Sequence, residues 1–346
     1  MDVAEALAKK ERVSLGFFPT PLMKLERLSR LLEINLYMKR DDFTGQNLFG
    51  GNKIRKLEYI MGKAKAEGAE YVFTYGATQS NHAMQTVSAC CKLGMKPVLF
   101  LTAIVKSEDY FGNLLLDKIM GAEIHIVNLE EGENEQDGMR RTFHQGHEYR
   151  RKLEAEGHKC FDVPMGGAVK EGSAAFIGGY EELENQLKGI GIHADYLFHA
   201  TGTGGTMAGL AAGRKLLLSD TEIISVQVGP NKETFAQENA DLGNDALEWL
   251  GFDRILTAGD IHLEGNYYYP GYEQPNEKAT EAIQLTANQE GILLDPVYSG
   301  KAMAGLIDYV RTGKIAKGSN VVFWHTGGTT ALFAEKEILG GLIETV

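Results

Sequence analysis

The clearest candidate for chemistry in this sequence is a loop rich in glycine and threonine. In YLFHATGTGGTMAGLAAG, an apolar run typical of a buried strand leads directly into residues 202–206, which open a stretch typical of a helix. Free backbone N–H groups, hydroxyls and the helix dipole then all face one point, which favours a bound phosphate. No lysine follows the glycines, which excludes a P-loop, and Met207 stands where a dinucleotide fingerprint needs its third glycine. The loop therefore predicts a phosphate site, with a tight structural turn as the alternative.

A lysine in a second glycine-rich segment is the candidate reactive group. Lys53 follows Gly-Gly-Asn in FGGNKIRKLEYI, at an expected junction between a loop and a helix, with Arg55 and Lys56 close by. Neighbouring positive charge and partial burial both lower the pKa of a lysine, as a Schiff-base or general-base lysine requires. A basic surface turn is the alternative interpretation of this segment.

The lysine and the phosphate loop complement each other. Pyridoxal phosphate needs a lysine for its aldehyde and an anion site for its phosphate, and the loop 202–206 has no lysine of its own. The two segments together therefore suggest this cofactor. A nucleotide-binding dehydrogenase lacks support because the third glycine and a following acidic ribose partner are absent. A non-catalytic ligand-binding protein is disfavoured because Lys53, Ser80 and Tyr298 occur together.

Polar side chains gather where another expected strand gives way to a helix. In TYGATQSNHAMQ the strand ends near Gly76, and Gln79, Ser80, Asn81 and His82 follow it. These side chains can form a polar nest for a carboxylate, but Ser80 is also a good helix N-cap by itself.

Two apolar runs near the C-terminus are also followed by polar side chains. LLDPVYSGK carries Tyr298 and Ser299, and VVFWHTGG carries His325 and Thr326. A tyrosine beside a Schiff-base lysine can act as an acid or a base if its pKa is lowered. A buried tyrosine with a single hydrogen bond is the alternative.

The elements that must position these groups alternate along the chain. Several strand candidates are continuous apolar runs, typical of strands buried on both faces of a parallel sheet. The strands are expected at Leu36–Lys39, Tyr71–Tyr75, Pro97–Thr102, Glu123–Val127, Tyr196–Ala200, Glu222–Val228 and Asn320–His325. Helix-period stretches separate them, which predicts an α/β architecture with crossover helices.

Glycine and charge narrow the class of protein further. The 346 residues include 41 glycines, and Gly-Gly pairs occur at 50–51, 166–167, 204–205 and 327–328, where strand-like runs meet polar turns. Ligands bind at the carboxyl ends of strands in such sheets, so the pairs suggest one site lined by glycine loops. The net charge of −12 argues against nucleic acid or an anionic membrane as a partner. The acidic segment LEEGENE (129–135) is interpreted as a solvated loop.

Cysteine usage and the N-terminus indicate where the protein acts. Three scattered cysteines are no disulfide framework, and residues 1–12 have no apolar signal core. We therefore expect a soluble, cytoplasmic protein.

With these motifs assembled, the chain resembles the fold-type-II pyridoxal phosphate enzymes of the ACC deaminase / D-cysteine desulfhydrase family. The resemblance covers nearly the whole length, through GGNKIRKLEY, GATQSNHAMQT, ATGTGGTMAGL, YYPGYEQPNE, LLDPVYSGKAMAGLID and HTGG. It implies a tryptophan-synthase-β-like fold of two three-layer α/β domains with the cofactor in the cleft between them. The large domain would comprise residues 1–50 and 165–346, and the small inserted domain residues 51–164.

The resemblance also implies roles for individual residues. Lys53 would form the Schiff base, Asn81 would bond the 3′ oxygen of the cofactor, and Tyr298 and Tyr267 would be active-site tyrosines, Tyr267 by its spacing from Pro270. The phosphate loop would be Gly202, Thr203, Gly204, Gly205 and Thr206. Gln79, Ser80, Asn81 and His82 would lie near the substrate, with Ser80 also catalytic. No metal is expected.

Two positions separate the branches of this family. ACC deaminases carry an acidic residue after the DPVY tyrosine and a leucine before the last Gly-Gly, whereas this chain has Ser299 and Thr326, as in the desulfhydrase branch. Neutral hydroxyls near the pyridine nitrogen favour an unprotonated ring, which is adequate when elimination follows loss of a Cα proton. Met84 departs from the desulfhydrases, which have an arginine there, so the substrate side chain can differ from that of cysteine.

The activity that the resemblance implies is a lyase reaction on a small amino acid. Lys53, assisted by Tyr298, would remove the Cα proton, a β-substituent would leave, and hydrolysis would give pyruvate and ammonia. D-Cysteine, with sulfide as leaving group, is the expected substrate. L-Cysteate, 3-chloroalanine, a diamino acid, another D-amino acid and ACC are the alternatives. The family implies a homodimer.

Overall fold

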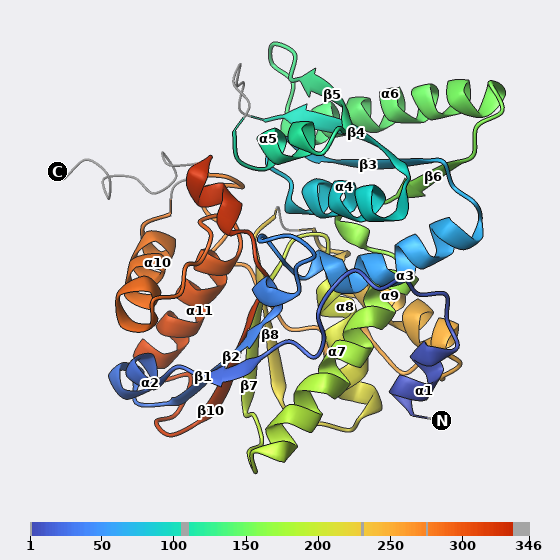
Figure 1. Cartoon of the computed structure of the whole chain (residues 1–346). Helices are drawn as coiled ribbons and strands as arrows, with labels where there is room; N and C mark the ends of the chain where they lie inside the picture. Colours follow the sequence, from blue (N-terminus) through green and yellow to red (C-terminus); the bar gives the residue numbers. More distant parts are fainter. Residues whose placement is uncertain (1, 105–110, 230–231, 275, 335–346) are drawn as a thin grey trace.

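The computed structural model describes residues 2–104, 111–229, 232–274 and 276–334, and its strands form two sheets (Figure 1). The larger sheet has six strands in the order β1-β2-β10-β7-β8-β9, and the smaller has four in the order β5-β4-β3-β6. The larger sheet comprises β1 (Leu22–Lys24), β2 (Asn35–Arg40), β7 (Tyr196–Thr201), β8 (Glu222–Gln227), β9 (Leu263–Glu264) and β10 (Asn320–His325). The smaller comprises β3 (Tyr71–Ala77), β4 (Lys96–Ala103), β5 (Glu123–Asn128) and β6 (Cys160–Val163).

All strand pairs are parallel except β1 with β2. The central strands are buried over almost their whole length, which explains why they are continuous apolar runs in the sequence. The seven expected strands are confirmed, with boundaries that differ by two residues at most. Strands β1, β6 and β9 were not expected, because two to four residues carry too little pattern.

Helices cover both faces of the larger sheet, so that it forms the middle of three layers (Figure 1). One face packs against α2 (Glu26–Leu32), α10 (Glu277–Glu290) and α11 (Ser299–Arg311). The other packs against α7 (Lys170–Gly189) and α8 (Gly205–Leu216), and α1 (Val3–Ala8) and α9 (Phe235–Leu250) lie against these helices.

The smaller sheet is likewise the middle of three layers. Helix α6 (Glu135–Ala155) covers one face through the aromatic cluster around Phe73 and Phe100. Helices α3 (Lys53–Ala66), α4 (Asn81–Leu93) and α5 (Gly112–Ile119) cover the other. Short 3-10 turns complete the described elements, at Asp41–Phe43, Met165–Gly167, Ala258–Asp260 and Thr329–Phe333.

The strands that make up each sheet indicate how the chain divides into two domains. Strands β1 and β2 come from the first 40 residues but pair with strands of the C-terminal half, whereas β3 to β6 pair only with one another. The boundaries at 50/51 and 164/165 stay a proposal, which this pairing supports. None of the helices in the described ranges is long and apolar enough to cross a membrane.

Candidate active site

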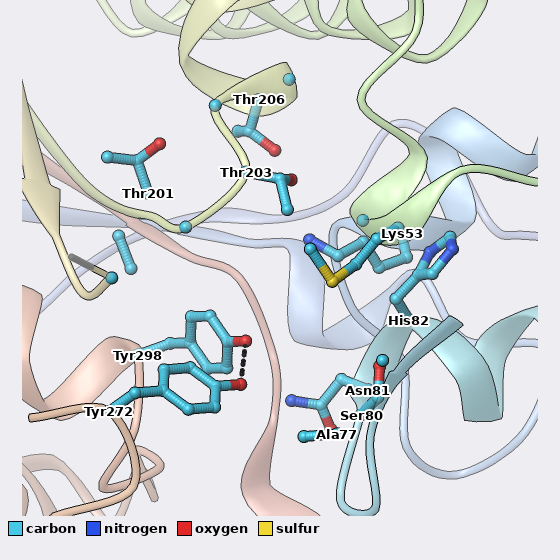
Figure 2. A pocket seen from close by; sticks show the side chains of 18 of the residues that line it. Lys53, Ala77, Ser80, Asn81, His82, Thr201, Thr203, Thr206, Tyr272 and Tyr298 are labelled. Carbon is cyan, nitrogen blue, oxygen red and sulfur yellow. Dashed lines mark hydrogen bonds between the residues drawn. The ribbon is translucent and has the colours of Figure 1, made fainter. Parts of the chain in front are cut away.

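A cavity of about 240 Å³ lies where the carboxyl ends of strands from both sheets meet. Strands β3 and β4 lead into it from the smaller sheet, and β7 and β10 from the larger. Of the residues expected in the site, eleven line it: Lys53, Ser80, Asn81, His82, Gly202, Thr203, Gly204, Gly205, Thr206, Tyr298 and Thr326. Figure 2 shows Lys53 between the phosphate loop on one side and the tyrosines and the Ser80–His82 turn on the other. Three of the four glycine pairs contribute to the cavity wall, through Gly166, Gly204, Gly205 and Gly327, whereas Gly50 and Gly51 are not among the lining residues.

The loop after β7 has the backbone that an anion cradle needs. Gly204 is in the left-handed conformation, with φ of +85°, and a Cβ there would lie 1.7 Å from Oδ1 of Asn239. Only glycine fits this position. Helix α8 begins at Gly205, so its first N–H groups have no partner within the helix. The Oγ1 of Thr206 accepts a hydrogen bond from Nδ2 of Asn52 at 3.0 Å, which ties this loop to the residue before Lys53.

The basic residues after Lys53 are buried, so the interpretation as a basic surface turn is wrong. Arg55 donates through Nε to Asp41 at 2.8 Å and through Nη2 to Glu182 at 2.8 Å, which anchors α3 to the larger sheet and α7. Lys56 is fully buried. Helix α3 therefore holds Lys53, its first residue, at the cavity.

Burial makes Lys53 a candidate nucleophile and base. Removal from water lowers its pKa to about 8. At pH 7 about a tenth of its amine is therefore uncharged, against less than about a thousandth for an ordinary lysine, and the uncharged amine is the form that attacks an aldehyde or removes a proton.

Lys56 supplies the cation that the phosphate loop lacks in sequence order. Its Nζ donates to the carbonyl oxygen of Gly166 at 3.0 Å and lies 3.0 Å from where a Cβ on Gly205 would be. Burial, and then the charge of Lys53, lower the pKa of Lys56 well below its ordinary value. No carboxylate of the described residues pairs with it, so an anion on the loop would stabilise its charge. The sequence did carry a signal for this role, because Lys56 lies three residues after Lys53 and therefore on the same face of α3.

The start of α4 presents donors to the cavity. Ser80 is the N-cap, as the alternative interpretation expected, because its Oγ accepts from the N–H of Ala83 at 3.2 Å. The Oδ1 of Asn81 accepts from Asn113 at 2.8 Å and from Thr330 at 3.2 Å. This leaves the Nδ2 of Asn81 free to donate into the cavity (Figure 2).

His82 is held in one tautomer by Thr74. The hydroxyl of Thr74 donates its single proton to the carbonyl oxygen of Val163 at 2.9 Å, so it must accept from Nε2–H of His82 at 3.0 Å. The Nδ1 of His82 is then a bare acceptor, buried and without a hydrogen-bond partner in the described part of the chain. Burial, and then the charges of Lys53 and Lys56, keep the pKa of His82 well below its ordinary value.

Gln79 is not part of the cavity wall, contrary to the expected contact with substrate. Its Nε2 donates to the carbonyl oxygen of Phe111 at 3.1 Å, and its Oε1 accepts from the N–H of Asn113 at 2.9 Å. Both ends of the amide are therefore used to hold the start of α5.

The tyrosine beside Tyr298 is Tyr272 rather than the expected Tyr267. The hydroxyls of Tyr272 and Tyr298 are hydrogen-bonded, and both rings line the cavity (Figure 2). Tyr267 packs in the core of the larger sheet and donates to Asp308 at 3.2 Å. Burial raises the pKa of Tyr298, so its hydroxyl stays protonated and acts as a donor instead of a base.

Ser299 and Met84 also lie outside the cavity wall. Ser299 is buried, and its Oγ donates to Oδ1 of Asp295 at 2.5 Å. Met84 is buried on α4 with its Sδ 3.6 Å from Nδ2 of Asn47, so the departure at this position does not reshape the cavity directly. Thr326 does line the cavity, and its carbonyl oxygen accepts from the N–H of Asn52 at 3.1 Å.

Several residues that line the cavity were not expected from the sequence. Besides Lys56 and Tyr272 they include Asn52, Thr102, Ile104, Glu135, Gln136 and Met139. The last three lie at the start of α6, and of these only Glu135 had been assigned to the solvated acidic loop.

The donor set fits pyridoxal phosphate. The glycine loop and the uncompensated Lys56 form an anion site, Lys53 can bond an aldehyde, and the free Nδ2 of Asn81 can donate to a ring oxygen. The described residues contain no group of three or more His, Cys, Asp or Glu side chains that could hold a metal.

Comparisons with known proteins identify the family and its cofactor. The model of the family described as pyridoxal-phosphate dependent enzyme matches residues 13–327. The 1-aminocyclopropane-1-carboxylate deaminase of Bradyrhizobium diazoefficiens is 37% identical over 340 residues, which cover 94% of this chain and 97% of that protein. The D-cysteine desulfhydrase of Serratia proteamaculans is 37% identical over 338 residues, which cover 96% and 98%. A crystal structure of an ACC deaminase homologue superposes with a TM-score of 0.88 at 35% identity and 99% coverage of both chains.

The chain therefore belongs to the pyridoxal-phosphate dependent enzyme family. It is a fold-type-II enzyme, and its cofactor is pyridoxal 5′-phosphate.

Proposed function

We propose that this enzyme catalyses α,β-elimination on a small β-substituted amino acid, with D-cysteine converted to pyruvate, ammonia and sulfide. The observation that carries the choice is the pair of hydroxyl residues Ser299 and Thr326 at the positions where the deaminase branch has an acid and a leucine. Thr326 lines the cavity, whereas Ser299 lies outside its wall and donates to Asp295. A D-cysteine desulfhydrase among the relatives supports it.

Separate groups of cavity residues would bind the cofactor and the substrate. The loop 202–206 and Lys56 would hold the phosphate, and Asn81 would hold the ring oxygen. The cofactor, when bound, supplies an electron sink for negative charge at Cα. The substrate carboxylate would rest on the N–H groups of Asn81 and His82, which have no partner within α4 because they begin it.

Lys53 would remove the Cα proton, which its lowered pKa supports. Tyr298, still protonated, would donate a hydrogen bond beside it. Elimination of L-cysteate, or of another D-amino acid, uses the same groups.

Ring opening of 1-aminocyclopropane-1-carboxylate is the second candidate, because relatives at 35 to 37% identity carry that name. This substrate has no Cα hydrogen and four carbons, so it would give a four-carbon keto acid instead of pyruvate. The acid that the deaminase branch carries is absent at Ser299.

One experiment separates the candidates. The purified holoenzyme is assayed with D- and L-cysteine, cysteate and 1-aminocyclopropane-1-carboxylate, and the keto acid and sulfide are measured. We expect pyruvate and sulfide from D-cysteine at the highest kcat/KM. Faster formation of the four-carbon keto acid would overturn the proposal. Lys53→Ala should lose both the yellow colour of the bound cofactor and the activity.

Two expectations from the sequence complete the proposal. The enzyme would be a homodimer, and sedimentation equilibrium tests this. It would also be cytoplasmic, and cell fractionation tests that.

A further inference from the structure

The four acids of the segment 129–135 have different surroundings, although the sequence suggested one solvated loop. Glu133 pairs with Arg141 at 2.5 Å, Glu130 approaches the same guanidinium at 3.6 Å, and Glu131 is exposed. Glu135 alone lines the cavity. It therefore needs a separate explanation.

The position of Glu135 is set by the start of α6, which lies over the smaller sheet (Figure 1). Asn134 is the N-cap and accepts from the N–H of Asp137 at 3.0 Å, which fixes the first turn. Gln136 and Met139 line the same wall. Tyr272 and Tyr298 line the same cavity as Glu135, and the negative charge of Glu135 adds to the rise that burial causes in the pKa of Tyr298.

The cavity therefore has opposite charges on its walls. Lys56 lies beside the phosphate loop and Lys53 between that loop and the tyrosines, whereas Glu135 is the only carboxylate among the described lining residues. Glu135 is half-buried, and no described cation pairs with it. Burial raises its pKa, which reflects this missing partner. The helix dipole favours an acid in this turn, but it does not supply a counter-charge inside the cavity.

We propose that Glu135 is a specificity-determining residue, which admits amino acids with a positively charged β-substituent and disfavours those with a negative one. This inference rests on the proposed function. The class it adds to D-cysteine is that of diamino acids, of which 2,3-diaminopropionate is the smallest. Cysteate, with its sulfonate, is the disfavoured class. A carboxylate facing an ammonium in a partly dry cavity forms a strong hydrogen bond, and it repels a sulfonate by the same charge.

The reaction balances without an oxidant or a reductant. The Cα–H bond of 2,3-diaminopropionate breaks and the proton passes to Lys53. The bond from Cβ to nitrogen then breaks with its electron pair on nitrogen, which leaves as ammonia. One water hydrolyses the remaining enamine, so one substrate and one water give one pyruvate and two ammonia.

The test compares Glu135→Gln with Glu131→Gln, which removes the same charge from the same segment outside the cavity. Holoenzymes are assayed for pyruvate with both enantiomers of 2,3-diaminopropionate, cysteine and cysteate. In Glu135→Gln we expect kcat/KM for 2,3-diaminopropionate to fall at least about tenfold relative to cysteine, and that for cysteate to rise, as expected for loss of a charged hydrogen bond. Glu131→Gln should leave both ratios within about twofold of the wild type, since exposed charges contribute little.

A second readout does not need turnover. Each amino acid is titrated against the absorbance of the bound cofactor, which gives a dissociation constant for each protein. If the wild type binds 2,3-diaminopropionate more tightly than cysteate, and Glu135→Gln loses this preference, the role of Glu135 stands even where no pyruvate forms. Absence of pyruvate with every one of these amino acids would instead contradict the proposed elimination. Equal preference in the wild type and in Glu135→Gln would overturn the inference about Glu135.

Discussion

The hydroxyl oxygens of Tyr272 and Tyr298 lie 2.5 Å apart, with their rings edge to face at 79°. The two residues come from separate segments, and Lys301 holds the first of these in place. Its buried Nζ donates to the carbonyl oxygens of Gly271 at 2.7 Å and Tyr268 at 3.4 Å. The side chain that orients Tyr298 is therefore positioned by a lysine one turn further along α11.

Removing the hydroxyl of Tyr272 should impair catalysis. Tyr272→Phe leaves the hydroxyl of Tyr298 without its partner, so we expect kcat to fall at least about tenfold, the loss of one well-placed hydrogen bond. Tyr267→Phe is the matched control, because that hydroxyl contacts Asp308 outside the cavity. The control should keep kcat within about twofold and lose about 1 kcal/mol of unfolding free energy. If steady-state assays showed a large loss of kcat in Tyr267→Phe and none in Tyr272→Phe, Tyr267 would be the active-site tyrosine.

The low pKa of Lys53 should be visible in uptake of the cofactor. Only the neutral amine attacks an aldehyde, so the rate at which the apoenzyme gains its yellow absorbance should rise with pH and level off above the pKa. With a pKa of about 8, the midpoint should lie near pH 8 instead of the ordinary 10.5. Stopped-flow absorbance from pH 6 to 10 measures it, and a midpoint above pH 10 would refute the effect of burial.

Lys56 should affect cofactor affinity and apoenzyme stability in opposite directions. In Lys56→Met, loss of a charged hydrogen bond to phosphate should raise the dissociation constant of the cofactor about 10- to 100-fold. The same change removes a buried amine whose charged form is disfavoured by burial and has no described carboxylate as partner, so the apoenzyme should melt at the same temperature or higher. Lys63→Met is the control on the same helix, where the lysine is half-exposed and pairs with Glu171 at 3.2 Å. Unchanged affinity in Lys56→Met would remove Lys56 from the phosphate site.

Asp117 should make stability depend on pH. It is fully buried on α5, neither carboxylate oxygen has a hydrogen-bond partner within the described ranges, and burial raises its pKa from 3.8 to about 8. Between these values the folded chain holds a proton that the unfolded chain has lost. The free energy of unfolding should therefore fall as pH rises from about 4 to 8, by up to about 1.4 kcal/mol per pH unit from this residue.

Asp117→Asn tests this because the amide cannot ionise. The melting temperature of the variant should exceed that of the wild type at pH 8, and the difference should shrink towards pH 4. Asp253→Asn, at an exposed position, should show no such trend. A constant difference across this range would contradict the assignment.

The sequence was sufficient for the parts of the site that lie at strand ends. The loop 202–206 follows β7 of the larger sheet and the Ser80–His82 turn follows β3 of the smaller one, so both lie at the carboxyl ends of parallel strands, where ligands bind. Such groups are set by local pattern and by topology, both of which the sequence carries.

The structure differs from the sequence-based expectations at side chains whose direction depends on tertiary contacts. Nothing in the run YYYPGY tells Tyr267 from Tyr272, because the path of that segment is set by Lys301. Gln79 is turned away by the start of α5, and Glu135 belongs to the cavity only because α6 packs over the smaller sheet. These contacts join residues distant in sequence, which periodicity does not record.

The isolated bridge between Gly51 and Gly327, with the hydrogen bond from Asn52 to Thr326, joins segments 276 positions apart. A growing chain thus exposes its lysine early but lacks the opposite wall until β10 has been made. Capture of the vitamin-derived cofactor is then a late event in biosynthesis, and chains broken off before residue 325 would be left without it. The colour of the purified protein thereby reports that the segments around Gly51 and Gly327 have come together.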